Sequence, residues 1–559
     1  MKKLSLAFIF AFFSSASLYA QIPDWEWAHS AESNYGIRSN TIALDTNGNI
    51  YTTGFGGGGL PIKFDSITIN TPYFFISKYS SSGNIQWAKG TVGGNNAQGI
   101  GIAIDLFNNI IVCGKSAPDN ITFGGITLNA TGNFLVKYRP NGSVIWAKNA
   151  AGVGNDSASV MHITKDKLGN IYIIGYFNCH NLYIGNTLLN NSQLGGSGSN
   201  DCFIAKYDSL GNPLWAASSG GDNNEMGHSI AVDTSGNVYI TGFFTSTIMN
   251  FNGTNIINNG NHDIFIAKYN SSGIIQWAKG FGGAGLEIGG SVIVDATNNI
   301  YHTGVFSSSN FNIGNFSIVN HTLQNASYMA KLDSSGNVRW AKNISLSGAI
   351  GTNYNNIISD NVKNLYIGGS FSDTVVIGNT TLIGKAGVFV ANFDSSGNSL
   401  WVQKAQSRNQ QGALVSGIVM DKKNNIYVSG YYYSDTLIFR NALLINSNPP
   451  GFNIEYMFVS KLSDAIVKVY EIEKENSIYI FPNPANTSIA IKLNNNLQEI
   501  SSLKIMNMQG EIVAQHTLLK NNYDAQQIDI SQLPNGIYVY SLFSNNKQLG
   551  KPGKLVVLH

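Results

Sequence analysis

Charged side chains are scarce in this chain of 559 residues. Asp, Glu, Lys and Arg together make up 12% of it, and the net charge is only +2. Proteins that bind nucleic acid carry a strongly basic face, and no basic stripe of that kind stands out here, so we expect no nucleic-acid partner. Apolar runs are also short. After residue 20 none approaches the ~20 residues that a membrane-spanning helix needs, so we expect no membrane span.

Cysteine is scarce as well, with three residues in the whole chain. Cys113 falls inside a predicted strand, where a buried thiol is the ordinary interpretation. Cys179 follows one predicted strand and Cys202 precedes the next, so the two residues fall at neighbouring ends of an antiparallel pair. In an oxidising compartment this arrangement favours a disulfide between Cys179 and Cys202, with two separate buried thiols as the alternative.

What the chain does contain is an internal repeat. An Asp opens each copy, an Asn follows four residues later and a Gly nine residues later; the Asp positions are Asp45, Asp105, Asp166, Asp233, Asp295, Asp360 and Asp421. A second element is aromatic-x-x-Lys, with Asn392 once in the Lys place, and a Trp follows that place by nine residues. These positions are Trp87, Trp146, Trp215, Trp277, Trp340 and Trp401. A repeat of this length indicates a propeller or solenoid.

Each copy predicts four short strands. In the fourth copy they are residues 229–232, 237–242, 265–269 and 274–278, rich in β-branched and aromatic side chains. Asp-Thr-Ser-Gly-Asn and Asn-Ser-Ser-Gly separate them as tight turns. Four antiparallel strands of this length form one blade of a β-propeller, and a blade buries its faces only against other blades. We therefore predict an all-β fold with a seven-bladed β-propeller over residues 21–470.

The last copy is incomplete, and the N-terminus supplies what it lacks. Lys461 is present, but Tyr470 stands where the Trp is expected, whereas Trp27 lies near the N-terminus without a preceding copy. We expect the N-terminal strand to pair with the strand of Phe458–Lys461 and close the ring. Over roughly Ile22 to Tyr470 the pattern resembles the bacterial β-propeller repeat family of secreted and surface proteins. That resemblance implies the fold and leaves the activity open.

Both ends of the chain predict export. Lys2 and Lys3 precede an apolar run to Phe13, then small and polar residues lead to Ala20; residues 1–20 are typical of a signal peptide. Residues 463–477 break the repeat and are predicted to be a linker. Residues 478–559 predict a small β-sandwich. Phe481-Pro-Asn-Pro484, Gly536-Ile-Tyr538 and the terminal apolar strand make it resemble the C-terminal sorting domain of the type IX secretion system of Bacteroidetes.

That resemblance implies a route and a partner. It implies passage through the periplasm, contact of residues 478–559 with the type IX machinery, and arrival in the medium or on the outer-membrane surface. We find no catalytic or cofactor-binding constellation. The repeated Asp residues are interpreted as turn caps, and the repeated Trp residues as packing between blades. The central channel is expected to be lined by Thr41, Gly101, His162, Ser229, Ser291, Asn356 and Gly417.

Three acidic residues follow the fourth strands of consecutive copies: Asp156, Glu225 and Glu287. They form a weak candidate for a metal site, calcium being possible, with solvated loop charges as the simpler interpretation. We expect the connections after strands two and four to form a variable loop face that binds a glycan, a protein or another surface partner. The alternatives are a glycan hydrolase or lyase on the same face, and a structural surface-layer component.

Overall fold

The computed structural model describes residues 22–463 and 478–559, except 71, 118, 130–131, 153–157, 193–198, 322–324, 346–349, 352–355, 409–411, 441, 447–453, 494–501, 508, 519–525 and 545–546. The predicted signal peptide and residues 464–477 of the predicted linker lie outside the described residues. The chain divides into two compact units, residues 1–465 and 466–559. The structure is all-β, and its only described helical element is the short 3-10 turn η1 (Gly57–Gly59).

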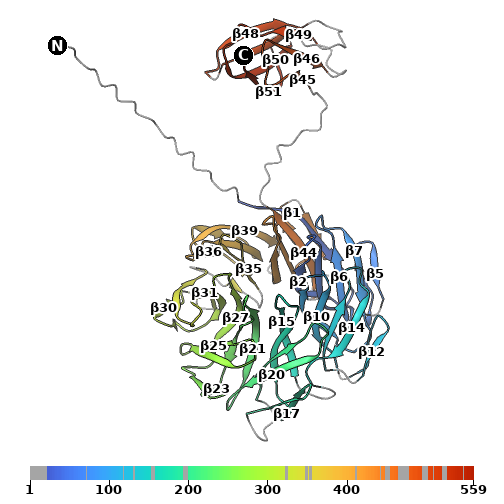
Figure 1. Ribbon diagram of the computed structural model, residues 1–559, viewed down its shortest axis with the longest axis vertical. Coiled ribbons are helices and arrows are strands. Elements are labelled where there is room, and N and C mark those ends of the chain that lie inside the picture. The colour runs from blue at the N-terminus through green and yellow to red at the C-terminus, as the bar shows by residue number, and fades with distance from the viewer. Residues whose placement is uncertain are drawn as a thin grey trace, which may run out of the picture. The chain divides into compact units, whose positions relative to one another are not determined.

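The first unit is built from four-stranded antiparallel sheets arranged about a common centre (Figure 1). We number them in chain order and give their strands from the innermost outward. Sheet 1 contains β2 (Ile37–Leu44), β3 (Ile50–Gly56), β6 (Phe74–Tyr79) and β7 (Ile85–Gly90); sheet 2 contains β9 (Gln98–Ile104), β10 (Ile110–Lys115), β13 (Asn133–Tyr138) and β14 (Val144–Asn149). Sheet 3 contains β15 (Ala158–Lys165), β16 (Ile171–Phe177), β19 (Asp201–Tyr207) and β20 (Pro213–Ser219).

The same order continues through the rest of the unit. Sheet 4 contains β21 (Glu225–Val232), β22 (Val238–Phe244), β25 (Asp263–Tyr269) and β26 (Ile275–Phe281); sheet 5 contains β27 (Glu287–Val294), β28 (Ile300–Phe306), β31 (Ala326–Leu332) and β32 (Val338–Asn343). Sheet 6 contains β34 (Ile357–Ser359), β35 (Leu365–Ser372), β38 (Ala386–Phe393) and β39 (Ser399–Ser407), with β33 (Ile350–Gly351) also on β35. Sheet 7 contains β40 (Ala413–Met420), β41 (Ile426–Tyr432), β44 (Tyr456–Ser463) and β1 (Asp24–Ala31).

The hydrophobic cores lie between neighbouring sheets. The second and third strands of each sheet are buried on both faces, which is why their sequences read as nearly continuous apolar runs. Ile76 of sheet 1 packs in one cluster with Val112 and Val136 of sheet 2. The last and first sheets pack in the same way, because Val459 of sheet 7 shares a cluster with Ile37 and Phe75 of sheet 1. Each innermost strand also contacts the next, from β2 through β9, β15, β21, β27 and β34 to β40, which contacts β2.

The N-terminal strand completes the last sheet. β1 pairs antiparallel with β44, and Trp27 lies opposite Lys461, where the sequence places it. Trp25, which is buried, packs edge-on against Phe439 with ring centroids 4.9 Å apart. Its Nε1 donates to the carbonyl of Lys404 in sheet 6 at 2.8 Å. The two ends of the first unit are therefore held in one sheet, and that sheet is tied to its neighbour.

A two-stranded hairpin follows the second strand of every sheet, which the sequence analysis did not anticipate (Figure 1). The hairpins are β4 (Ile62–Phe64) with β5 (Ile67–Ile69), β11 (Ile121–Phe123) with β12 (Ile126–Leu128), β17 (Asn181–Ile184) with β18 (Thr187–Asn190), β23 (Ile248–Phe251) with β24 (Thr254–Ile257), β29 (Asn310–Ile313) with β30 (Phe316–Val319), β36 (Val375–Ile377) with β37 (Thr380–Leu382), and β42 (Thr436–Phe439) with β43 (Ala442–Ile445). Their signal was a short alternating run around a tight turn. Asn252 and Gly253, both at positive φ, form such a turn.

These hairpins also tie neighbouring sheets together. Several pair with the chain that leaves the outer strand of the preceding sheet: β11 pairs with β8 (Val92–Gly93), β42 with β39, and Asn250 and Asn312 bridge to Gly220 and Gly282. Glu32, which extends β1, bridges to Lys63 of the first hairpin. The connections after the second strand are thus part of the framework, and their outward side chains are presented on a rigid backbone.

The second unit holds two antiparallel sheets. One contains β45 (Ile478–Phe481), β46 (Ser488–Leu493) and β49 (Gln526–Asp529); the other contains β47 (Ser502–Met506), β48 (Ile512–Thr517), β50 (Gly536–Ser544) and β51 (Lys547–Val557). Ile489 and Ile491 of the first sheet share one buried cluster with Leu503, Ile505 and Leu555 of the second. Over the described residues of the chain, no helix is long and apolar enough to cross a membrane.

Candidate functional site

The repeated Asp residues cap their own turns. One oxygen of Asp45 accepts the backbone N–H groups of Asn47 and Asn49, each at 2.9 Å, and the other accepts Asn49 Nδ2 and the Tyr51 hydroxyl. Asp421 makes the same four contacts within the corresponding turn of sheet 7. Each carboxylate is occupied by donors from one turn, so the turn interpretation of these residues is confirmed.

The repeated Trp and Lys residues join one sheet to the next. Trp277 Nε1 and Lys268 Nζ of sheet 4 both donate to the Ser334 carbonyl in the outer turn of sheet 5, at 3.2 and 3.4 Å. The pair Trp87 and Lys78 binds the Pro140 carbonyl in the same way, and Trp215 and Lys206 bind that of Ser271. The Trp ring also covers a turn glycine, because a Cβ added at Gly336 would lie 3.1 Å from the ring of Trp277. These residues hold neighbouring sheets together, as expected.

Two of the three acidic candidates are buried rather than presented to a ligand. Glu225 and Glu287 are each 0% exposed at the start of β21 and β27. Glu225 accepts from Gly221 N–H at 2.9 Å and from the Ser246 hydroxyl; Glu287 accepts from Gly283 N–H at 2.8 Å and Ser308 N–H at 3.1 Å. Both side chains therefore bind the loops at the start of their strands. Asp156 lies outside the described residues.

Each buried Glu has an acidic neighbour that the sequence analysis missed. Asp201 and Asp263 open β19 and β25, the third strands of sheets 3 and 4, and are 1% and 0% exposed. Their Oδ1 atoms are buried without a hydrogen-bond partner among the described residues. Burial raises the pKa of Asp201 and of Asp263 to about 6, and the charge of Glu287 adds to the increase at Asp263. The repeat itself carried the signal. Among the sheets whose corresponding residues are described, only sheets 3 and 4 begin their third strand with Asp, and each is followed by a sheet whose first strand begins with Glu.

The same burial acts on Glu225. It raises the pKa of Glu225 to about 8, and the charge of Asp201 adds to the increase. Among the described residues, no group of three or more His, Cys, Asp or Glu side chains is placed to hold a metal ion. Glu225 consequently holds a proton at neutral pH, and the expectation of calcium stays a prediction.

The predicted disulfide is not formed. Cys202 lies opposite Tyr176 in the ladder between β16 and β19, and Cys179 follows Tyr176 by three residues. Side chains alternate between faces, and the two thiols pack on opposite faces of sheet 3. Cys202 belongs to the core shared with sheet 4, whereas Cys179 packs against the core shared with sheet 2. The two sulfur atoms are not bonded to each other, so the expectation from strand ends alone was wrong.

The central channel is lined partly as expected. A cavity of about 290 Å³ at the innermost strands is bordered by Thr41, His162, Ser291 and Gly417, with Ile and Val side chains between them. His162 Nδ1 accepts the backbone N–H of Ile230 at 3.1 Å. Burial lowers the pKa of His162 to about 4, so this side chain is neutral at physiological pH and joins sheet 3 to sheet 4.

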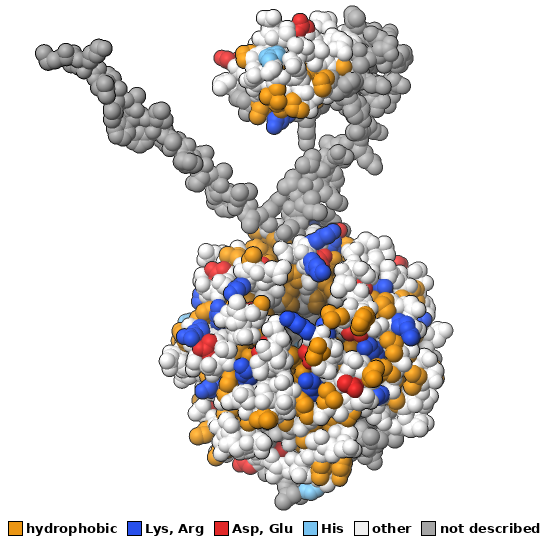
Figure 2. All heavy atoms as spheres, viewed as in Figure 1, with side chains coloured by type: hydrophobic (Ala, Val, Ile, Leu, Met, Phe, Trp, Pro, Cys, Tyr) orange, Lys and Arg blue, Asp and Glu red, His pale blue; other side chains and the backbone are white. Residues whose placement is uncertain are grey.

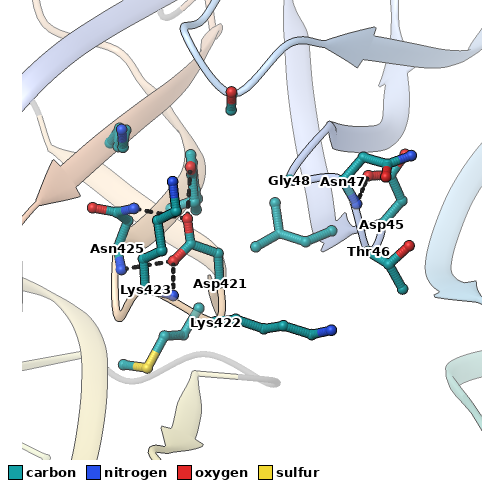
Figure 3. A pocket seen from close by; sticks show the side chains of 13 residues that line it. Asp45, Thr46, Asn47, Gly48, Asp421, Lys422, Lys423 and Asn425 are labelled. Carbon is teal, nitrogen blue, oxygen red and sulfur yellow. Dashed lines mark hydrogen bonds between the residues drawn. The ribbon is translucent and has the colours of Figure 1, made fainter.

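A larger cavity lies between the last and first sheets (Figure 3). It measures about 480 Å³ and is bordered by the Asp turns of β2–β3 and β40–β41. Asp45 and Gly48 lie on one side of it, and Lys422 and Lys423 on the other. Ser81 and Lys461 complete its outer wall. We call it the seam cavity, because it marks the place where the two ends of the first unit meet.

The outward faces of the hairpins are the other exposed feature. In β17, β23 and β29 the burial alternates identically, with every second side chain inside. The exposed positions differ from sheet to sheet and combine Asn with large apolar groups, among them Tyr183, Ile248 and Ile257. Figure 2 shows one face of the unit, over which basic side chains are scattered among apolar ones. The framework is therefore constant, and the surface it carries is variable.

Comparison with known proteins identifies the two parts of the chain. Residues 479–557 match the family model described as the secretion system C-terminal sorting domain, and residues 219–242 match the β-propeller repeat model. The chain carries β-propeller repeats and a type IX sorting domain. The sorting domain directs the protein to secretion and the cell surface, as the sequence predicts.

More distant matches add little. An uncharacterized WD repeat-containing protein, L264, of Acanthamoeba polyphaga mimivirus is 24% identical over 446 residues, which are 66% of this chain and 32% of that protein. The chain thus spans about a third of that relative. Among solved structures, PorZ, a surface component of the type IX secretion system of Porphyromonas gingivalis, aligns with 95% of this chain and 100% of its own at 11% identity and a TM-score of 0.21. The extracellular domain of BT4673 from B. thetaiotaomicron gives 10% identity, coverage of 93% and 81%, and a TM-score of 0.21. Scores this low carry no argument.

Proposed function

We propose that this protein is a secreted binding protein: a seven-bladed β-propeller, closed by β1, delivered to the cell surface by a C-terminal β-sandwich that contacts the type IX machinery. Its partner is an extracellular glycan, protein or other surface component. The blade count is supported by the succession of four-stranded sheets in which β40 contacts β2. The sandwich is supported by the single core that the two C-terminal sheets share.

The observation that carries the binding role is the array of hairpins. Their inward side chains repeat from sheet to sheet, and their backbones are tied to the preceding sheet. Their outward side chains vary and expose large groups: Tyr183 is 58% exposed and Ile257 is 64% exposed. A rigid backbone with exposed aromatic and aliphatic groups beside Asn amides suits recognition of a sugar or peptide surface, since little ordering entropy is lost on binding.

Glu225 and Glu287 take no catalytic part in this proposal. A glycosidase needs two carboxyl groups that face a sugar across a cleft. These two residues are buried, and their oxygens accept hydrogen bonds from Gly and Ser groups of their own loops. Their neighbours Asp201 and Asp263 are equally buried. The loop-face carboxylates thus support the binding role over the hydrolase or lyase alternative.

A glycan array probed with the full mature chain tests the proposal. We expect binding to one class of glycan that Tyr183→Ala and Ile257→Ala together reduce at least tenfold. The matched control is Phe107→Ala with Leu168→Ala, because these residues are also large, apolar and exposed but lie on Asp turns. If no glycan binds, a photo-crosslinker at position 183 on the bacterial surface should capture a protein that a crosslinker at position 107 does not. Equal results at both positions would refute binding through the hairpins.

A further inference from the structure

The seam cavity lies at a boundary that lacks the paired Trp and Lys contact found at three other boundaries. At three boundaries a Trp Nε1 and a Lys Nζ of one sheet both donate to a carbonyl in the next sheet; the acceptors are Pro140, Ser271 and Ser334. At the boundary between sheets 7 and 1 the corresponding groups are Trp27, Lys461 and the turn of Ser81. Trp27 covers the turn as its counterparts do, since a Cβ added at Gly83 would lie 2.9 Å from its ring.

The donors at this boundary are used differently. Lys461 Nζ pairs with Glu26 at 2.7 Å, and its side chain is only 12% exposed. Trp27 Nε1 is buried and has no hydrogen-bond partner among the described residues. The outer turn of sheet 1 packs on Trp27 but does not share a carbonyl with Lys461, and Ser81 of that turn and Lys461 both line the cavity. At about 480 Å³ this space is in the range of small-ligand sites, which are roughly 300 to 1,000 Å³.

The charged side chains at the cavity differ in whether they are free to bind a ligand. Asp45 and Asp421 each accept four hydrogen bonds within their own turns, so their oxygens are already occupied. Lys422 and Lys423, by contrast, are exposed, and neither forms an ion pair with a described residue. Figure 3 shows Lys423 beside Asp421, whereas the Lys422 side chain extends from the same turn toward the side of Asp45 and Thr46. The charged groups that are free to bind a ligand there are therefore cationic.

We propose that the seam cavity binds a small oxyanion-bearing ligand, in which a carboxylate, phosphate or sulfate group is held by Lys422 and Lys423. The binding is charge-assisted at the two ammonium groups, and the cavity between the Asp turns receives the rest of the ligand. This site lies on the turns between the first and second strands, so it is separate from the hairpin surface and does not depend on its partner.

Isothermal titration calorimetry of the full mature chain with glucuronate and with glucose tests the site, because the two sugars differ in one carboxylate. We expect glucuronate to bind and glucose to bind at least tenfold more weakly. Inorganic phosphate should compete with glucuronate, and binding should weaken in 0.5 M salt, where the Debye length falls to about 4 Å. Equal binding of the two sugars, or heat from neither, would overturn the proposal.

A matched pair of variants locates the site. Lys422→Ala with Lys423→Ala should reduce glucuronate binding at least tenfold. Lys167→Ala with Lys363→Ala removes the same charge from the corresponding Asp turns of sheets 3 and 6 and should leave binding unchanged. Circular dichroism checks that all variants are folded. If both double variants lose binding equally, the effect is one of net charge, and the seam cavity is not the site.

Discussion

Asp201 and Glu225 are buried together at the boundary between sheets 3 and 4. Glu225 N–H donates to the carbonyl of Asn200, the residue before Asp201, at 2.6 Å. Asp263 and Glu287 repeat the arrangement one sheet later, where Glu287 N–H donates to the carbonyl of His262 at 2.8 Å. Each Asp also packs on a glycine: a Cβ at Gly220 would lie 2.2 Å from the carboxyl carbon of Asp201. Burial and the charge of Asp201 both favour the protonated form of Glu225 and raise its pKa.

Stability should therefore fall as the pH rises. Burial raises the folded pKa of Glu225 to about 8, above the unfolded value of about 4.3. The folded state then binds the proton more tightly than the unfolded state does. The stabilisation is complete below about pH 4 and is lost as the pH rises through about 8. Calorimetric unfolding of the full chain between pH 5 and 9 should show this decline.

Replacing the two acidic side chains by neutral ones identifies the source of this pH-dependent loss of stability. Asp201→Asn with Glu225→Gln should flatten the decline and recover ~2 kcal/mol at pH 9, which corresponds to one to two pKa units. Glu32→Gln, at an exposed carboxylate, is the control and should leave the profile unchanged. A pH profile that is the same in the unsubstituted protein and in both variants would contradict a bound proton on Glu225.

The N-terminal strand should be essential to the first unit. Deleting residues 22–31 removes the outer strand of sheet 7 together with buried Trp25, and Trp25→Ala alone should cost about 3 to 5 kcal/mol. Trp25→Phe should recover much of this cost, since it keeps the ring beside Phe439 and loses only the hydrogen bond to Lys404. Thermal denaturation measures all three. An unchanged midpoint after the deletion would show that β1 is dispensable.

Cys179 and Cys202 should be recovered without a disulfide between them. Their side chains pack on opposite faces of sheet 3, so bonding them would require the strand end to rotate. Mass spectrometry of unreduced peptides from the secreted protein is the measurement. Cys179→Ser should change the thermal midpoint by less than about 2 °C, because no loop-closing cross-link is lost. A peptide containing both residues joined would refute the structural assignment.

The C-terminal unit should act as a sorting signal that directs the protein to the cell surface. A chain ending at Ser477 keeps the first unit, with its own cores and its own closing strand, and loses the sorting domain. In the native host we expect this truncated protein to fold and to accumulate in the periplasm. Cell fractionation checks its location, and protease resistance of the first unit checks its folding. Normal arrival at the surface would contradict the sorting role, and loss of folding would contradict the independence of the two units.

The sequence by itself determined the repeat, the turns and the destination. The Asp-x-x-x-Asn spacing encodes contacts within five residues, such as Asp45 with Asn49, so no tertiary information is needed to read it. The Trp and Lys positions recur in register, so their role in joining sheets could also be inferred. The position of Trp27 beside Lys461 could also be predicted from the number of repeat elements, because the last copy lacks its Trp and the N-terminus has a Trp without a copy of its own.

Only the tertiary structure decided which side chains meet across a boundary. The face of the sheet on which a side chain lies depends on strand register. Pairing Cys179 with Cys202 from their strand ends was therefore wrong, because the two side chains pack on opposite faces of sheet 3. The partners Asp201 and Glu225 are 24 positions apart and meet only because consecutive sheets stack. The seam cavity is likewise invisible in the sequence, because the Asp turns that border it come from opposite ends of the first unit's sequence.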